Sequence, residues 1–138
     1  MTLHIDPSAA SSSKVGVARR DRGRRAYLTG EAAEKSVVRV YKGRGAELLE
    51  TRWRGQSGEI DLIFLCNGVY VFCEVKAAPT IEAAVLRLRP VQIRRIHLAA
   101  SEYLGRTPAG QLSEVRFDLA ACEASGRVEI TENAFGHL

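Results

Sequence analysis

Two carboxylates are predicted to meet on one face of a β-hairpin. Apolar-rich segments at residues 59–66 and 69–76 flank Asn67-Gly68, a dipeptide typical of two-residue hairpin turns. This turn sets a register in which Asp61 lies directly opposite Glu74. Directly opposed side chains have Cβ atoms about 4.5–5.5 Å apart, so two like charges there repel each other. A divalent cation is the obvious compensation for such a pair.

The residues around this pair match the needs of phosphodiester hydrolysis. Such a reaction needs hard oxygen ligands for Mg²⁺ or Mn²⁺, with positions left for water and phosphate. Asp61 and Glu74 supply two carboxylates, and the backbone carbonyl of Val75 adds a third oxygen. Lys76 shares a face with Glu74, where its charge can orient or deprotonate water and stabilise developing charge. We therefore predict a metal-dependent hydrolytic site at these four residues.

Each of these charged groups also has a simpler interpretation. Glu-x-Lys is common on strands, Asp61 could pair with an arginine, and Glu59 could form a cross-strand ion pair with Lys76. Convergence of several charged groups on one otherwise apolar hairpin favours the site over these alternatives.

A first helix, predicted over residues 27–42 from its apolar periodicity, contributes one more acidic residue. Glu34 falls inside the apolar arc of this helix, between Tyr41 and Val38 in helical projection. A carboxylate in that position either extends out to solvent or turns towards the sheet. In the second case Glu34 ligates the metal directly or through water, so we include it among the catalytic and metal-binding candidates.

The remaining elements predict an α/β domain. A strand is expected at about 46–54, a helix from Pro90 to about Gly105, and strands at about 115–121 and 127–131, while residues 77–87 are ambiguous. The order of helix, three strands, helix and one or two strands indicates a mixed sheet with an antiparallel first half. The expected domain covers residues 26–132, between a basic arm at 1–25 and a tail at 133–138.

The excess positive charge is confined to the N-terminal arm. Residues 1–27 hold six of the 20 basic residues and two of the 16 acidic residues, so the rest of the chain is neutral. Such an arm increases phosphate affinity without sequence specificity, and a solvated tail is the equally open alternative. The candidate nucleic-acid contacts are Arg19, Arg20, Arg24 and Arg25 in the arm, together with Arg54 and Gln92.

The composition also bears on where the protein works. No apolar run approaches the roughly 20 residues that span a bilayer, and the start of the chain has no apolar signal core. The three cysteines are odd in number and lack CxxC spacing, which suits a reducing compartment. We expect a cytoplasmic protein that does not enter a membrane.

The hairpin closely resembles the YraN family of small bacterial proteins, in Gly58-Glu59-Ile60-Asp61-Leu62-Ile63 and Val71-Phe72-Cys73-Glu74-Val75-Lys76. The resemblance extends over residues 27–121 and includes Gly30–Glu34, Arg52-Trp53-Arg54 and Arg116-Phe117-Asp118. It implies an αβββαβ restriction-endonuclease-like fold, as in Holliday-junction-resolvase-like PD-(D/E)xK nucleases. Its acidic pair and Glu-x-Lys fall on Asp61, Glu74 and Lys76, and its helical acid falls on Glu34.

The resemblance implies a Mg²⁺- or Mn²⁺-dependent endonuclease that acts on DNA, with branched or flapped DNA as candidate substrates. Nucleases of this architecture often act as homodimers, although no residue here identifies an interface. The long basic arm departs from the family pattern, and Cys73 replaces a more usual valine. Gln92 stands where a lysine or arginine is expected, and it is either a helix-boundary residue or a group that reaches the site.

Two other functions remain open from the sequence. One is a non-catalytic nucleic-acid-binding module on a nuclease-like scaffold, and the other is an interaction protein whose carboxylates are structural. Trp53, between two arginines, is either a stacking platform for bases or, as is commoner for a strand tryptophan, a core residue.

Overall fold

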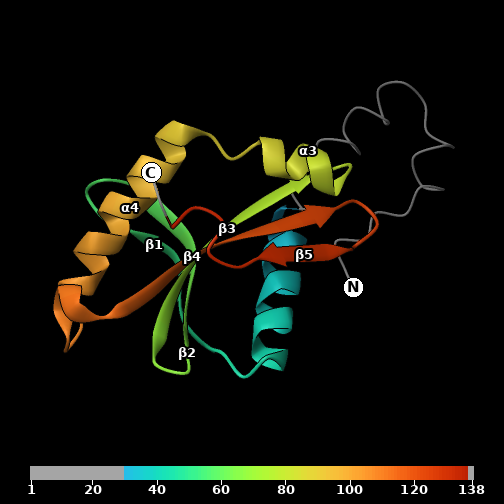
Figure 1. Ribbon diagram of the computed structural model, residues 1–138. Coiled ribbons are helices and arrows are strands. Elements are labelled where there is room, and N and C mark those ends of the chain that lie inside the picture. Colours follow the sequence, from blue (N-terminus) through green and yellow to red (C-terminus); the bar gives the residue numbers. More distant parts are fainter. Residues whose placement is uncertain (1–29, 137–138) are drawn as a thin grey trace, which may run out of the picture.

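A computed structural model describes residues 30–136 of the chain (Figure 1). The arm residues Arg19, Arg20, Arg24 and Arg25 lie outside this part. Residues 30–43 are helical, and the elements that follow are β1 (Glu47–Arg54), β2 (Glu59–Cys66), β3 (Val69–Ala78), α3 (Ile81–Leu86), α4 (Pro90–Leu104), a 3₁₀ turn (Gly110–Leu112), β4 (Glu114–Glu123) and β5 (Val128–Thr131). None of the helices in this part is long and apolar enough to cross a membrane.

The five strands form one mixed sheet in the order β1-β2-β3-β4-β5. β1, β2 and β3 pair antiparallel in sequence, β3 and β4 pair parallel, and β5 returns antiparallel beside β4. The parallel pair needs a long crossover, which α3 and α4 supply. The predicted α/β domain, with an antiparallel first half in a mixed sheet, is confirmed.

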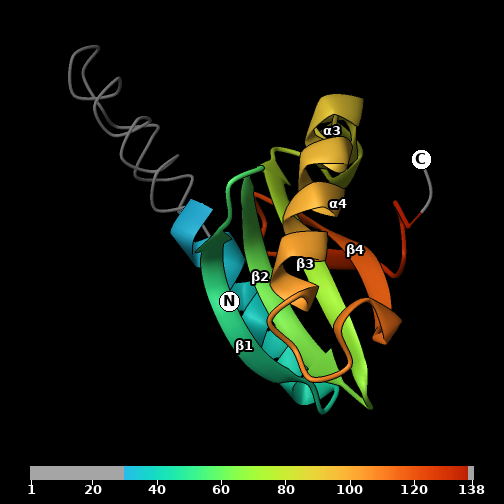
Figure 2. The same cartoon turned by 90° about the vertical axis from the view of Figure 1, so that its left-hand side faces the viewer.

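Helices cover both faces of the sheet, so the domain has three layers (Figure 2). The helix of residues 30–43 packs Val37 and Tyr41 against Leu62 and Phe64 of β2. On the other face, α4 presents Ile96, Ala99 and Ala100 to a cluster that includes residues of β2, β3 and β4. Both faces of the central strands are therefore buried, which explains why β2 and β3 are almost continuously apolar.

The predicted hairpin has the predicted register. Cys66 pairs with Val69, and regular pairing continues up to Leu62 and Cys73. Asn67 and Gly68 have φ angles of 51° and 80°, as a two-residue type I′ turn requires. Regular pairing therefore ends one step before Asp61 and Glu74.

Trp53 is a packed residue, as expected for a strand tryptophan. It belongs to the cluster beneath α4, and its ring meets Tyr103 edge-on at 5.3 Å between centroids. The Arg106 guanidinium lies 5.3 Å from the centre of the Trp53 ring. These contacts occupy the ring, so it does not offer an open stacking platform.

The structure resolves one segment that the sequence left ambiguous and differs from the sequence-based expectation in another. The ambiguous residues 77–87 contain the end of β3 and the short helix α3, whose first turn is capped by Thr80 Oγ1 accepting from the Ala83 N–H at 3.1 Å. A tail was expected from residue 133, but Phe135 is buried against Phe117 and His97. A single aromatic residue among polar neighbours has no periodicity, so the sequence pattern could not reveal this packing.

Candidate active site

Asp61 lies where the β2–β3 ladder ends. Its Oδ2 accepts a hydrogen bond from the Val75 backbone N–H at 2.8 Å, so a side chain joins the two strands beyond the last regular pair. Val75 contacts Asp61 through its N–H, and the metal-binding role of its carbonyl stays a prediction. This bond fixes the orientation of the Asp61 carboxylate.

An irregularity in two neighbouring strands sets the direction of Asp61. Ile60 packs in the cluster beneath α4, whereas Leu62 packs beneath the helix of residues 30–43, although residues two apart in a regular strand share a face. The regular alternation of side chains between the two faces of β2 is therefore interrupted at Asp61. On β1 the residue opposite is Arg52, whose backbone φ angle of 49° is uncommon for a residue other than glycine. Pairing on both sides of Arg52 and Asp61 keeps one register, so the change lies in the backbone conformation at these residues and not in an inserted residue.

Glu74 and Lys76 occupy the same end of β3. Glu74 is only 8% exposed, and its Oε2 lies 3.2 Å from Lys76 Nζ. Burial, and after it the charge of Asp61, raises the pKa of Glu74 to about 8, although Lys76 acts in the opposite direction. The structure therefore brings Asp61, Glu74 and Lys76 together, as the hairpin register predicts.

These carboxylates face a polar pocket of about 240 Å³ between the sheet and α4. Gln92 lines this pocket while its Oε1 accepts from the Arg89 N–H at 3.1 Å, so it is both a boundary residue of α4 and a group at the site. Arg95, one helical turn later, lines the same pocket. Arg95 is not among the residues that the sequence singled out, although its i+3 spacing from Gln92 places both on one helix face.

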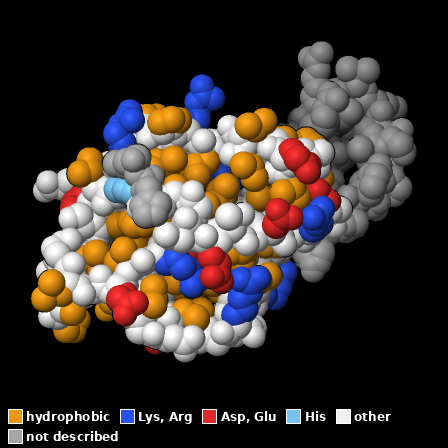
Figure 3. All heavy atoms as spheres, viewed as in Figure 1, with side chains coloured by type: hydrophobic (Ala, Val, Ile, Leu, Met, Phe, Trp, Pro, Cys, Tyr) orange, Lys and Arg blue, Asp and Glu red, His pale blue; other side chains and the backbone are white. Residues whose placement is uncertain are grey.

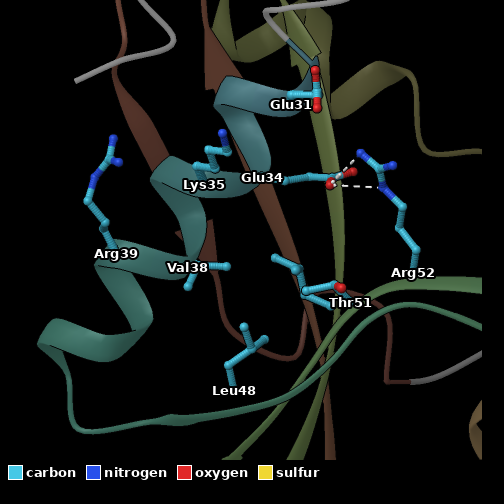
Figure 4. A pocket seen from close by; sticks show the side chains of 9 residues that line it. Glu31, Glu34, Lys35, Val38, Arg39, Leu48, Thr51 and Arg52 are labelled. Atoms are coloured by element: carbon cyan, nitrogen blue, oxygen red, sulfur yellow. Dashed lines mark hydrogen bonds and ion pairs between the residues drawn. The ribbon is translucent and has the colours of Figure 1, made fainter.

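Glu34 lies apart from the carboxylate pair. Arg52 donates to Glu34 Oε1 from Nη2 at 3.2 Å and from Nε at 3.3 Å (Figure 4). Burial raises the pKa of Glu34, Arg52 opposes that rise, and the charges of Asp61 and Glu59 add to it. Within residues 30–136 no three His, Cys, Asp or Glu side chains are grouped closely enough to hold a metal ion. Glu34 is thus near the site, and the structure does not bring it to Asp61 and Glu74.

Glu59 does not pair with Lys76. Its Oε2 lies 3.5 Å from Arg54 Nη2, across the β1–β2 pair. The simple cross-strand ion pair that competed with the site hypothesis is therefore replaced by a pair with Arg54, and Lys76 contacts Glu74 instead. Arg54 is 78% exposed, which leaves most of its side chain in solvent beside the site.

Asp118 is the buried charge that sequence reasoning missed. It is fully buried, and it accepts from Tyr41 Oη at 2.6 Å, from the Asn133 N–H at 2.9 Å and from two nitrogens of Arg116 at 2.9 Å each. Arg116 Nη1 also lies 3.6 Å from Oε1 of Glu132, which is half exposed. On the face drawn in Figure 3, acidic and basic side chains lie side by side in several places. These bonds satisfy Asp118, so its role is to join three segments. An acid within the apolar run of β4 was the available signal.

Comparison with known proteins places these residues in a family. The model of uncharacterised protein family UPF0102 matches residues 33–122, which contain Glu34, Asp61, Glu74 and Lys76. A UPF0102 protein of Ruegeria pomeroyi is 50% identical over 116 residues, covering 84% of this chain and 94% of the relative. Those of Roseobacter denitrificans and Dinoroseobacter shibae are 46% and 45% identical, covering 81% and 88% of this chain and 87% and 90% of the relatives. The chain therefore belongs to the uncharacterised protein family UPF0102, which is the YraN family that its hairpin resembles.

Proposed function

We propose that this protein is a Mg²⁺- or Mn²⁺-dependent endonuclease that hydrolyses DNA phosphodiesters at the Asp61–Glu74–Lys76 site. The observation that carries the proposal is that Asp61 and Glu74 line one polar pocket at the end of the β2–β3 ladder, with Lys76 Nζ 3.2 Å from Glu74. A stability role alone gives no reason to place two acids side by side with one of them almost buried, because such a pair costs free energy.

The donor set fits a divalent metal of this kind. Mg²⁺ is commonly held by one or two carboxylates, and water and substrate phosphate complete its coordination. Asp61 and Glu74 satisfy that requirement without a third protein ligand, which is consistent with the separate position of Glu34. Both are hard oxygen donors, and no cysteine or histidine that would favour a softer metal is among the described residues that line the pocket.

The residues around the pocket have separable roles in hydrolysis. A metal bound at the carboxylates would stabilise charge on the phosphate and favour deprotonation of water. Lys76, held 3.2 Å from Glu74, keeps a positive charge at the reacting centre, where it orients water and stabilises the developing negative charge. The Val75 N–H holds Asp61 in one orientation. Gln92 and Arg95 on the α4 side supply donors for phosphate oxygens.

DNA fits this site because phosphate-binding groups surround it. Arg95 lines the pocket and Arg54 is largely exposed next to Glu59. The basic residues 1–27 add charge that binds the phosphate backbone without regard to sequence. Branched or flapped DNA is the substrate class that we infer, and a homodimer is the corresponding assembly on two-stranded DNA.

The position of Glu34 favours one alternative. Of the predicted acidic residues, only Asp61 and Glu74 line the pocket, while Glu34 pairs with Arg52. A non-catalytic nucleic-acid-binding module on this scaffold would not need Glu34 to join Asp61 and Glu74. Its DNA binding would fall steeply with salt and would not change on Asp61→Ala.

The test is a cleavage assay on a panel of linear, flapped and branched DNA with Mg²⁺ or Mn²⁺. We expect cleavage by the wild-type protein, and its loss on Asp61→Asn and on Lys76→Ala. Glu129→Gln is the matched control, since it removes a half-exposed carboxylate from the edge strand β5. Cleavage that survives both site substitutions would show that the activity belongs to a contaminant. Salt-dependent binding without cleavage would favour the alternative.

A further inference from the structure

A second pocket lies between the helix of residues 30–43 and β1. It has a volume of about 470 Å³, within the range of roughly 300–1,000 Å³ that holds small molecules. Figure 4 shows Glu34 and Arg52 joined by hydrogen bonds at its wall, with Val38, Leu48 and Thr51 to one side of that pair. The proposed active site uses none of its apolar residues.

The chemistry of this pocket suits a flat ring with polar edges. Val38, Leu48 and the fully buried Leu62 form an apolar floor. Unpaired bases are bound between apolar side chains or against the plane of an arginine guanidinium, here that of Arg52. The carboxylate of Glu34 at the wall is an acceptor for the amino group of a base.

The pocket and the candidate active site lie on opposite faces of the sheet, and they approach each other where β1 pairs with β2. Thr51 pairs with Leu62 and Trp53 pairs with Ile60, so Arg52 of the pocket lies opposite Asp61 of the site. The charge of Asp61 contributes to the raised pKa of Glu34, so the two places interact electrostatically. One nucleotide chain that passes this end of the β1–β2 pair can therefore place a base on one face of the sheet and the neighbouring phosphate on the other.

The rim of the pocket carries charge suited to a nucleic acid backbone. Lys35 and Arg39 lie on the helix side and are both exposed, and Arg52 lies on the strand side. Lining basic residues outnumber the two acidic ones, Glu31 and Glu34. An apolar floor bordered by cations matches a base flanked by its own phosphates. A purely apolar ligand would make no favourable electrostatic contact with the charged rim.

We propose that this pocket holds one unpaired nucleobase of the DNA strand whose phosphate lies at the Asp61–Glu74 site. The inference rests on the proposed function and specifies its substrate, namely DNA with an unpaired nucleotide next to the cleaved phosphate. A base inside a duplex must first be unstacked and unpaired, which costs free energy, whereas an already unpaired base enters at the lowest cost.

The experiment measures binding in the full-length chain carrying Asp61→Asn, so that cleavage does not interfere. The ligands are duplexes with a single-nucleotide bulge and the same duplexes with an abasic site in the bulge. Thr51→Trp fills the pocket from an exposed wall residue, and Glu47→Trp is the matched control on the same strand, exposed and outside the pocket. Fluorescence anisotropy in Mg²⁺ gives the dissociation constants.

With Thr51 intact, the protein should bind the duplex with a bulged base about tenfold more tightly than the duplex with an abasic bulge. A difference of this size is typical of one stacked base. Thr51→Trp should remove this ratio, and Glu47→Trp should preserve it. Equal affinity for the base and the abasic bulge, or an unchanged ratio in Thr51→Trp, would overturn the inference. Base dependence without any wild-type cleavage would remove only the proposed catalysis. Cleavage without base dependence would remove only this inference.

Discussion

Replacing Glu74 by glutamine should stabilise the metal-free protein at alkaline pH. Glu74 has a pKa of about 8 in the folded protein, compared with 4.5 for a free glutamate, because it is buried beside Asp61. The folded state therefore holds a proton that the unfolded state has already lost, and stability falls as pH rises from about 4.5 to about 8. The full shift corresponds to on the order of 5 kcal/mol. A glutamine side chain carries no charge at any pH, so the variant should lack this loss.

Urea unfolding between pH 5 and pH 9 in a metal-free buffer measures the effect. We expect the wild-type unfolding free energy to decrease over this range and the Glu74→Gln profile to be much flatter. Glu129→Gln is the control, because Glu129 is half exposed and its removal should leave the shape of the profile unchanged. Carbon-13 NMR of the carboxyl group reports the titration of Glu74 directly.

Divalent metal should oppose the loss of stability at alkaline pH. Mg²⁺ or Mn²⁺ binds the charged carboxylates, so added metal should raise the melting temperature more at pH 8.5 than at pH 6, by mass action. Wild-type and Glu74→Gln profiles that run parallel, or an NMR midpoint near 4.5, would refute the burial argument for this pair. Equal metal stabilisation of both proteins would refute Glu74 as a ligand.

Other predictions concern the packing that supports the site. Asp118→Ala should cost about 3–5 kcal/mol in urea unfolding, because it leaves the Arg116 charge without its buried partner, whereas Glu129→Ala should cost about 0–1 kcal/mol. Phe135→Ala should cost about 3 kcal/mol, measured the same way, and a change near zero would mean that residues 133–136 do not stabilise the domain. Gly68→Ala should cost about 1–2 kcal/mol, because φ at this position is 80°, and Gly126, with φ of 99° in the β4–β5 turn, should behave alike on substitution. Thermal melts of the Gly68 and Gly126 variants test these two predictions.

The predictable part of the site is the part that local sequence determines. Asn67-Gly68 fixes the turn, the turn fixes the register, and the period of two places Lys76 on the face of Glu74. No long-range information is needed for these relations, which is why three charged groups were placed correctly. The helix and strand order follows in the same way from apolar periodicity.

The positions that depended on distant or irregular backbone were not predictable. Glu34 pairs with Arg52, 18 residues later, and Arg52 reaches it from a left-handed backbone position that no sequence pattern announces. Asp118 is buried because Tyr41, Arg116 and Asn133 meet around it from three separate segments. Phe135 shares that dependence on a completed fold.

The parallel pairing of β3 with β4 has a consequence for how the chain reaches its native state. Hairpin closure alone brings Asp61 and Glu74 together, since they are only 13 positions apart in the sequence. Glu74 pairs with Leu119, 45 positions later, so its removal from water must wait until the crossover is complete. The electrostatic penalty of the site is therefore incurred late in folding, after most local structure has formed. A neutral residue at position 74 should accelerate that last step, and the rate of refolding rather than the stability would record the order of events.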